Sequence, residues 1–250
     1  MSKVKSKDIT FVMQGPFAES GKFDSNKSIF SLRESFPESQ IIVSTWVGQG
    51  LQFLGMDFLI ESIDPGVPSV GESKVCSINR QLVSSYAGLK KVSTKYAVKI
   101  RSDCRLVSDK LMTTLGSLDE EKLVIIEYSS VHSVVGYHKL NYNLCDWFVA
   151  GNREGVEALF NRDLVSDDDL SYWCDRKKPW LHSLPECVEL FQAEQYLWLP
   201  MAAKHQPCNL KHGFDFHFSD FVRFMNFASQ TVTVLAPEDL SLESSKHPSL

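Results

Sequence analysis

The stretch KYAVKIRSDCRL (Lys95–Leu106) is the best guide to how this chain folds. In its first part, Tyr96, Val98 and Ile100 alternate with Ala97 and Lys99, a pattern typical of a buried strand. The stretch then becomes charged, with the carboxylate of Asp103 placed between Arg101 and Arg105. A strand that leaves a core and ends on one carboxylate between two guanidinium groups raises the question of what that carboxylate holds.

The segments before this stretch alternate between strand and helix patterns. Short apolar runs predict strands at Ile9–Gly15, Gln40–Trp46 and Asp57–Gly66, and helical spacing predicts helices at Asn26–Pro37 and Glu72–Val92. This order indicates an α/β fold, in which a mainly parallel sheet carries helices on its faces. In such sheets, ligands bind in the crevice outside the carboxyl ends of the strands.

The second half of the chain is less regular. We predict a strand at Lys122–Ser130, a strand turning into a helix at Cys145–Phe160, and a helix at Pro185–Lys204 that is interrupted at Pro200. The polar segment 161–184, with its interleaved aromatic residues, has the composition of a loop over a site. We expect one domain, residues 1–235, and a loosely held tail, residues 236–250.

The composition is that of an ordinary globular protein, with 43% hydrophobic and 23% charged residues. A net charge of −5 provides no general attraction to nucleic acid, so we expect no nucleic-acid partner. No apolar run approaches the roughly 20 residues that span a bilayer, and the N-terminus lacks a signal-peptide cleavage site. The six scattered cysteines indicate free thiols and a cytoplasmic protein. The basic segments SKVKSK (2–7) and RKKPW (176–180) are candidates for peripheral contact with the inner membrane.

Polar residues follow the predicted strands. In a parallel sheet, four tripeptides would meet at one edge: Gln14-Gly15-Pro16, Ser44-Thr45-Trp46, Asp64-Pro65-Gly66 and Arg101-Ser102-Asp103. The glycine after the first strand would let the backbone approach a bound group. An ordinary turn between strand and loop would have the same sequence.

Asp103 and Arg80 are the charged residues best suited to a phosphorylated ligand. A carboxylate at a sheet edge can bind Mg²⁺ or Mn²⁺ that bridges phosphates; alternatively, Asp103 pairs with Arg101 or Arg105. Arg80, in the segment Asn79–Gln81, carries a planar fork that suits a diphosphate, although surface arginines are common.

Asp146 and Glu194 are candidates for a general base, which requires a partly desolvated carboxylate near an acceptor hydroxyl. Trp147 and Tyr196 beside them would suit sugar stacking, or would belong to the core. His212, close to Asp215, is a candidate for completing a metal site, although a polar loop would show the same pattern.

A series of sequence blocks occurs here in a distinctive order: DITFVMQGPF, FPESQIIVSTWVG, DPG, NRQLVSSYAGL, YAVKIRSD, DWFVAG and AEQYLW. In this order they resemble the WavE-type lipopolysaccharide-synthesis proteins of bacteria, over residues 8–198. The resemblance implies a GT-A-like (Rossmann-like) glycosyltransferase with a nucleotide-binding half, 8–105, and an acceptor-side half, 106–235. The partners implied are a nucleotide-sugar donor and a glycan or glycolipid acceptor of lipopolysaccharide core, O-antigen or capsule synthesis.

The resemblance also implies roles for individual residues. Asp103 would face a divalent cation, Mg²⁺ or Mn²⁺, and Asp146 and Glu194 would be catalytic acids on the acceptor side. The donor would contact Gln14, Gly15, Pro16, Ser44, Thr45, Trp46, Asp64, Asn79, Arg80 and Arg101. One position departs from the family's DxD pattern, because Arg105 replaces the second aspartate. Either Asp103 acts with a distant ligand such as His212, or arginines neutralise the leaving group without a metal.

Two other functions stay open from the sequence. A sugar nucleotidyltransferase would share the fold, but the segment after the first strand lacks the basic, glycine-rich loop usual in that class. A non-catalytic nucleotide- or glycan-binding protein with a degenerate fold is the other alternative, and Arg105 is the residue that favours it.

Overall fold

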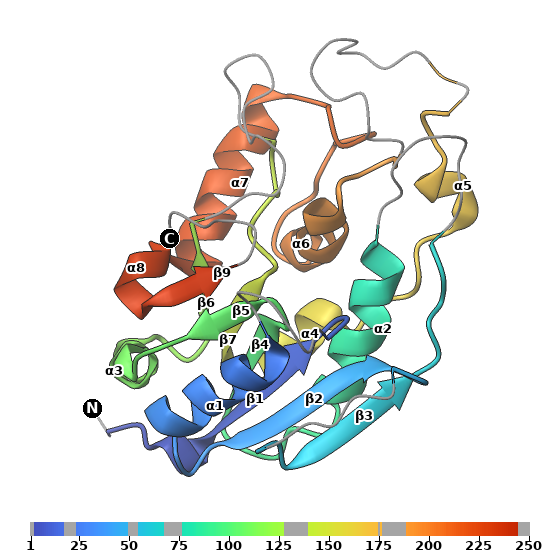
Figure 1. The fold of residues 1–250 in the computed structure, drawn as a ribbon. Coiled ribbons are helices and arrows are strands. Elements are labelled where there is room, and N and C mark those ends of the chain that lie inside the picture. The colour runs from blue at the N-terminus through green and yellow to red at the C-terminus, as the bar shows by residue number, and fades with distance from the viewer. Residues whose placement is uncertain are drawn as a thin grey trace.

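A seven-stranded sheet forms the centre of the molecule in the computed structural model (Figure 1). The structure describes residues 3–17, 24–49, 55–67, 77–127, 140–174, 176 and 189–244. The strands lie in the order β3 (Phe58–Ser62), β2 (Gln40–Trp46), β1 (Ile9–Gln14), β4 (Tyr96–Arg101), β7 (Phe148–Asn152), β6 (Leu123–Ile126) and β8 (Val232–Leu235). Strand β7 runs antiparallel to both of its neighbours, and the other pairs are parallel. The predicted α/β fold with a mostly parallel central sheet is therefore confirmed.

Helices cover both faces of this sheet. One face packs against α1 (Ser25–Ser35), α3 (Lys110–Ser117), α8 (Pro237–Leu240) and a small sheet of β5 (Cys104–Leu106) with β9 (Leu242–Ser244). The other face packs against α2 (Ile78–Leu89), α4 (Arg153–Phe160), α6 (Ala193–Ala203) and α7 (Phe218–Thr231). A 3₁₀ turn, η1 (Ser6–Asp8), precedes β1, and the short α5 (Asp167–Leu170) follows α4.

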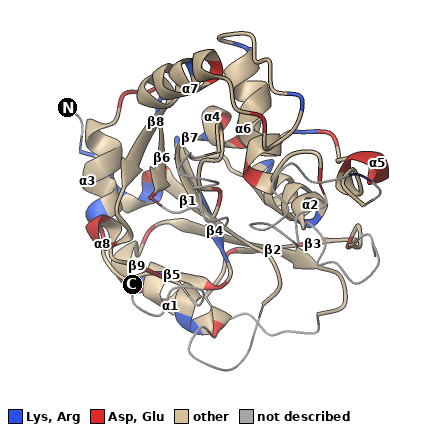
Figure 2. Cartoon of the chain, turned by 90° about the horizontal axis from the view of Figure 1, so that it is seen from above, with Lys and Arg blue, Asp and Glu red and all other residues tan. Residues whose placement is uncertain are grey.

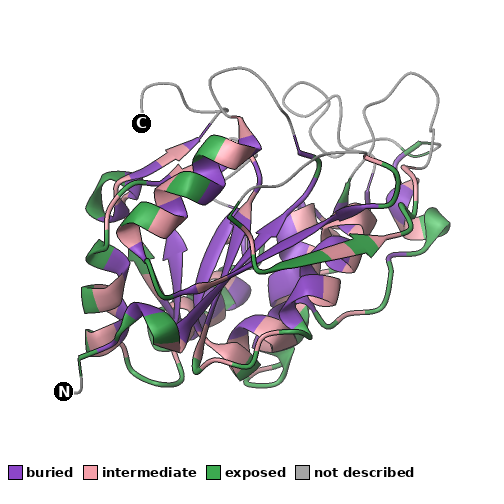
Figure 3. Ribbon diagram, turned by 60° about the horizontal axis from the view of Figure 1, so that its bottom comes forward, coloured by how far each residue is buried: buried purple, intermediate pink, exposed green. Residues whose placement is uncertain are grey.

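The central strands are apolar on both faces because each face meets a layer of helices. In β1, Phe11 and Met13 point into one core and Val12 points into the other. The edge strand β3 is largely exposed, whereas the central strands are buried in Figure 3. Polar residues of these strands are buried as well, among them Thr10, Ser44 and Thr45, and Lys99 in β4 departs furthest from the apolar pattern because its amine is completely buried.

The direction in which the chain crosses the sheet creates a crevice between β1 and β4. The connection from β1 to β2 passes through α1 on one face, whereas the connection from β3 to β4 passes through α2 on the other face. Because the strand order reverses there, the carboxyl ends of β1 and β4 have an open space between the two connections.

Two sequence predictions are wrong in detail. Residues 237–244, predicted as part of a loose tail, form α8 and β9 because β9 pairs with β5 in register from Cys104↔Ser244 to Leu106↔Leu242. Helix α6 continues through Pro200 rather than stopping there, and buried Trp198 and Ala202 hold it on both sides of the proline.

The structure describes only part of the segments for which membrane contact and the start of the helix at Pro185 were predicted. The predicted helix start at Pro185 and most of the RKKPW segment lie outside the described residues; Arg176 of that segment stacks on Tyr172. The basic N-terminal segment leads into η1, with Val4 and Ser6 buried. None of the described helices is long and apolar enough to cross a membrane. Basic and acidic residues are interspersed over the described chain in Figure 2.

Candidate functional site

A cavity of about 490 Å³ opens at the carboxyl ends of β1 and β4. Its walls are formed by Gln14, Gly15, Pro16, Trp46, Gln49, Asp64, Ser77, Arg80, Gln81, Arg101, Ser102, Asp103 and Asp146. Nine of the residues singled out from the sequence are among them. The cavity lies at the reversal of strand order, as expected for a ligand site in an α/β sheet.

The loop after β1 shapes one wall of the cavity. Gly15 has φ = +115°, a backbone conformation that side chains rarely adopt, and a Cβ placed there would lie 3.3 Å from the Ser102 hydroxyl. The Ser102 amide donates to the Gln14 carbonyl at 2.9 Å, and its hydroxyl donates to the Pro16 carbonyl. The turn after β4 thus fixes the backbone of the loop after β1.

Ser44 and Thr45 support this loop from behind and do not line the cavity. The Thr45 hydroxyl lies 3.0 Å from the Gly15 carbonyl, to which it donates, and the side chain of Gln49 accepts from the Phe17 amide at 3.2 Å. The Ser44 hydroxyl donates to the Ser84 carbonyl on α2 at 2.6 Å. Of the expected Ser44-Thr45-Trp46 group, only Trp46 forms part of the wall.

Helix α2 presents one face to the cavity, formed by Ser77 just before it, Arg80 and Gln81. These residues are three and four positions apart, which is the spacing of neighbours on a helix surface. Asn79 lies on a different face, where its side chain amide donates to the Val165 carbonyl at 3.0 Å and its carbonyl accepts from the Val165 amide at 2.8 Å. Asn79 therefore anchors the segment after α4 and lies outside the cavity wall.

Two arginines of the cavity each form a two-point ion pair with an aspartate. Arg101 donates from Nε and Nη2 to the two carboxylate oxygens of Asp103 at 2.9 and 2.8 Å. Arg80 donates from the same two nitrogens to Asp64 at 2.8 and 2.6 Å. The Arg80 hydrogen bond lowers the pKa of Asp64, against a smaller effect of burial. For Arg101, burial is the largest single effect and lowers the pKa, but the charge and hydrogen bonds of Asp103, together with Cys104 and Asp146, outweigh it and the pKa is raised.

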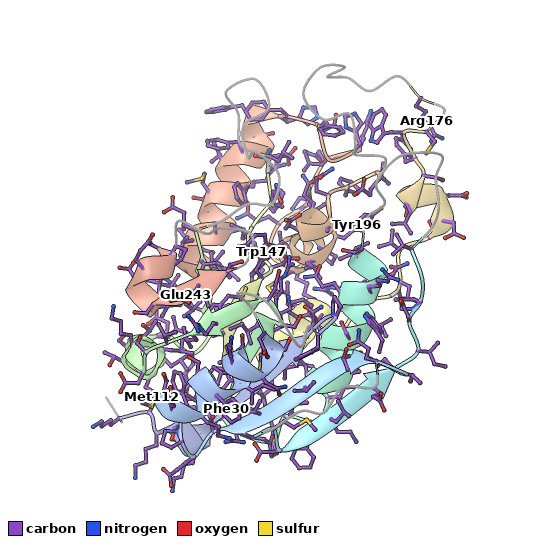
Figure 4. All side chains as sticks on the ribbon, in the orientation of Figure 1. Phe30, Met112, Trp147, Arg176, Tyr196 and Glu243 are labelled. Atoms are coloured by element: carbon purple, nitrogen blue, oxygen red, sulfur yellow. The ribbon has the colours of Figure 1, made fainter. Side chains whose placement is uncertain are left out.

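Trp147 fixes the plane of the Arg101 guanidinium. The guanidinium carbon lies 4.8 Å from the centroid of the indole ring, a cation–π distance. Trp147 is buried in the centre of the molecule, where Figure 4 labels it. Stacking and ion pairing together give Arg101 a defined orientation in the cavity wall.

Asp146 is the buried carboxylate of the cavity. It is 5% exposed, and its Oδ2 accepts a hydrogen bond from the Gln81 amide. Its Oδ1 has no hydrogen-bond partner among the described residues. A buried carboxylate oxygen of this kind, held in place through its neighbour and without a partner among the described residues, is chemically suited to accept a proton from a bound hydroxyl.

Beneath Asp146 lies Lys99, whose Nζ donates to the Asp146 backbone carbonyl at 2.6 Å. Its ammonium group also lies 5.2 Å from the centroid of the Phe160 ring. Burial lowers the pKa of Lys99 to about 8, although the charge of Asp146 partly opposes this effect.

Two candidate residues from the sequence, Glu194 and His212, lie elsewhere, and so does Arg105, which stands at the second position of the DxD pattern. Glu194 is buried in the first turn of α6 and is not part of the cavity wall. His212 pairs with Asp215 at 3.2 Å and stacks against Trp173, also away from the wall. Arg105 pairs with Glu243 of β9, which Figure 4 labels.

Four residues of the cavity wall were given no ligand-binding role from the sequence: Gln49, Ser77, Gln81 and Ser102. For Ser77 and Gln81 the signal was present, since both share the helix face of Arg80. Ser102 lies inside the RSD stretch itself, between two residues that were predicted. Nothing in the sequence points to Gln49, which reaches the wall from the loop after β2.

The sequence profile of the WavE lipopolysaccharide synthesis family matches residues 9–247. This chain belongs to that family. The WavE match covers every element that forms the cavity. No curated protein matches the sequence.

Solved structures with a similar fold include two enzymes at low sequence identity. The 4-diphosphocytidyl-2C-methyl-D-erythritolsynthase of Anaerococcus prevotii is 12% identical, with a TM-score of 0.40 over 70% of this chain and 87% of that chain. The glycosyltransferase GlyE of Streptococcus pneumoniae, in its apo form, is 13% identical, with a TM-score of 0.38 over 92% of this chain and 45% of GlyE. This WavE chain thus spans less than half of GlyE.

Proposed function

We propose that this WavE protein is a glycosyltransferase that moves a sugar from a nucleotide-sugar donor to a glycan acceptor in lipopolysaccharide synthesis. One observation carries the proposal: a single cavity combines two oriented arginines with a buried carboxylate, Asp146, that has an unpaired oxygen. Arginine forks suit a phosphorylated leaving group, and the carboxylate suits an acceptor hydroxyl.

The donor is oriented by the wall formed from the strand ends. Gln14 contributes a buried side-chain oxygen, Oε1, that has no hydrogen-bond partner among the described residues and can accept an N–H group of a base. Trp46 offers an aromatic surface beside it. This end of the cavity takes the nucleoside, and Arg80 and Arg101 take the phosphates.

The transfer is a single displacement. The acceptor hydroxyl oxygen forms a bond to the anomeric carbon, while the bond from that carbon to the donor phosphate breaks and leaves its electron pair on the phosphate oxygen. Asp146 Oδ1 receives the hydroxyl proton. The arginines stabilise the negative charge that develops on the leaving phosphate. Asp146 takes the role of base in preference to Glu194, because Glu194 does not form part of the cavity wall.

The acceptor is a lipid-linked glycan that the protein reaches from the cytoplasmic side through peripheral contact with the inner membrane. The family assignment to lipopolysaccharide synthesis supports this class of acceptor. A capsule or O-antigen glycan has the same chemistry at its reacting hydroxyl.

The test uses Asp146→Asn, which keeps a side chain of the same shape but a much weaker base. UDP-, GDP- and CMP-sugars are offered with deacylated lipopolysaccharide as the acceptor, and nucleotide release and glycan transfer are measured. We expect Asp146→Asn to reduce transfer roughly 100- to 10,000-fold, with thermal unfolding and donor binding preserved. Asp119→Asn, at an exposed acid paired with Lys122, is the matched control and keeps full activity.

Near-normal transfer by Asp146→Asn would show that Asp146 is not the general base. Release of pyrophosphate from a nucleoside triphosphate and a sugar phosphate would indicate a nucleotidyltransferase instead. Failure of the wild type to bind any nucleotide would favour a non-catalytic protein.

A further inference from the structure

The two arginines of the cavity are bound on one edge only. Both use Nε and Nη2 to hold an aspartate, Asp64 for Arg80 and Asp103 for Arg101. Their Nη1 groups donate no hydrogen bond to any described residue. Because a guanidinium is planar and has five N–H donors, an aspartate on one edge leaves donors for a second anion on another edge. Each ion pair therefore fixes the orientation of an arginine and leaves its remaining N–H groups available to a ligand.

The carboxylates of the cavity do not form a set of metal ligands. Among the described residues, no group of three His, Cys, Asp or Glu side chains lies close enough to hold a metal ion. Both oxygens of Asp103 accept from Arg101, which places a positive charge where a divalent cation would have to bind. Asp64 is engaged by Arg80 in the same way. The residues present therefore do not fit a Mg²⁺ or Mn²⁺ site of the kind expected from the sequence.

The second position of a DxD pair also has another role in this fold. Arg105 stands at that position and donates from Nε to Glu243 at 2.9 Å across the β5–β9 pair. An arginine held in this way anchors the C-terminal strand to the segment after Asp103. It supplies no ligand oxygen, and its own positive charge opposes a neighbouring cation.

From these contacts we infer that the cavity binds a nucleoside diphosphate through the free edges of Arg80 and Arg101, without a divalent cation. This inference rests on the proposed glycosyltransferase function and specifies how the leaving diphosphate is neutralised. Asp103 and Asp64 are then positioning residues, which act on the ligand through the arginines they hold. Asp103 contributes no metal coordination.

Binding with a metal and binding without one predict opposite effects of Asp103→Asn on the affinity for a diphosphate. If Asp103 held a metal, its replacement by asparagine would weaken diphosphate binding. If it only orients Arg101, asparagine keeps one acceptor oxygen for the guanidinium and removes a negative charge next to the ligand. Binding of a diphosphate to Asp103→Asn is then at least as tight as binding to the wild type.

The experiment measures the dissociation constants of UDP, GDP, ADP and CDP by calorimetry, first in EDTA and then with Mg²⁺ or Mn²⁺. We expect at least one of them to bind the wild type in EDTA, with an affinity that added cation leaves unchanged. Arg101→Gln and Arg80→Gln each weaken binding roughly 10- to 100-fold. Arg153→Gln, which breaks an exposed Arg–Glu pair outside the cavity, leaves it unchanged.

The possible results separate this inference from the function on which it rests. Binding that requires a cation and is lost in Asp103→Asn would overturn the inference while supporting the nucleotide site. No binding of any diphosphate, with or without cation, would overturn both. The comparison of EDTA with added cation uses the wild type alone, so it decides the question even if a variant fails to fold.

Discussion

Lys99 allows a quantitative test of the structure, because a fully buried lysine makes protein stability depend on pH. Among the described residues its Nζ has one hydrogen-bond acceptor, the Asp146 carbonyl, and its pKa falls to about 8 from an ordinary value of 10.5, mainly because of burial. Substitution by methionine, Lys99→Met, keeps the length and apolar stem of the side chain and removes the titrating group.

The pKa difference gives the sign and size of the effect. Below pH 8 the lysine is charged in both states, and the folded protein binds this proton less tightly than the unfolded chain does. The charged group then destabilises the fold by about 3 kcal/mol, the equivalent of the interval between 10.5 and about 8. As the pH rises from 8 to 10.5, only the unfolded chain still binds the proton. The contribution of Lys99 to the free energy of unfolding therefore rises by about 3 kcal/mol across this window.

Urea unfolding of the wild type and Lys99→Met over this pH range measures the effect. The thiols of Cys104 and Cys145, whose pKa values are raised by burial, lower stability in alkali in both proteins, and the difference removes the part of this loss that is independent of Lys99. Loss of the hydrogen bond to the Asp146 carbonyl lowers the free energy of unfolding of Lys99→Met by about 1–3 kcal/mol, and this loss does not vary with pH. Exposed Lys95, substituted as Lys95→Met, shows no rise between pH 8 and 10.5. A difference between wild type and Lys99→Met that stays flat from pH 8 to 10.5 would refute the reasoning.

Two further substitutions test the packing around the cavity. Gly88→Ala places a Cβ 2.5 Å from Val12 Cγ1 and 3.0 Å from Ser44 Cβ, so we expect a loss of about 1–3 kcal/mol in thermal or urea unfolding; a gain of about 1 kcal/mol from helix propensity would show that α2 shifts freely. Asn79→Ala removes two hydrogen bonds to Val165 and costs about 1–2 kcal/mol, with nucleotide affinity unchanged. Reduced affinity at unchanged stability would instead make Asn79 part of the ligand site.

Strands β1, β2 and β4 could be predicted because burial on both faces requires a continuous run of mainly apolar residues. Strand β2 was predicted as Gln40–Trp46, the bounds that the structure has, and β1 and β4 differ only at their ends. Strand β9 could not be found in this way. Three residues, Leu242–Ser244, are too short for a periodic pattern, and their partner β5 is about 138 positions away in the chain.

The rule for strand ends predicted which segments would meet at the cavity, but the orientation of single side chains could not be predicted in this way. Asn79 and Arg80 are adjacent in sequence, so they point about 100° apart around α2, and only Arg80 faces the cavity. Counting in steps of three and four from Arg80 would have selected Ser77 and Gln81. The choice between Asp146 and Glu194 depends on how α6 packs against the sheet, which local sequence does not encode.

The pairing of β5 with β9 has a consequence for the order in which the molecule is completed during synthesis. Arg105 follows Asp103 by two positions, yet the carboxylate that anchors it, that of Glu243, is made only after another 138 residues have been added. A nascent chain that has already formed β1, β2 and β4 can make the Ser102 hydrogen bonds to Gln14 and Pro16, but it lacks the β5–β9 pairing that holds the segment after Asp103. The full set of contacts around the ligand cavity is therefore complete only after residue 243 has left the ribosome, long after the first strands have paired.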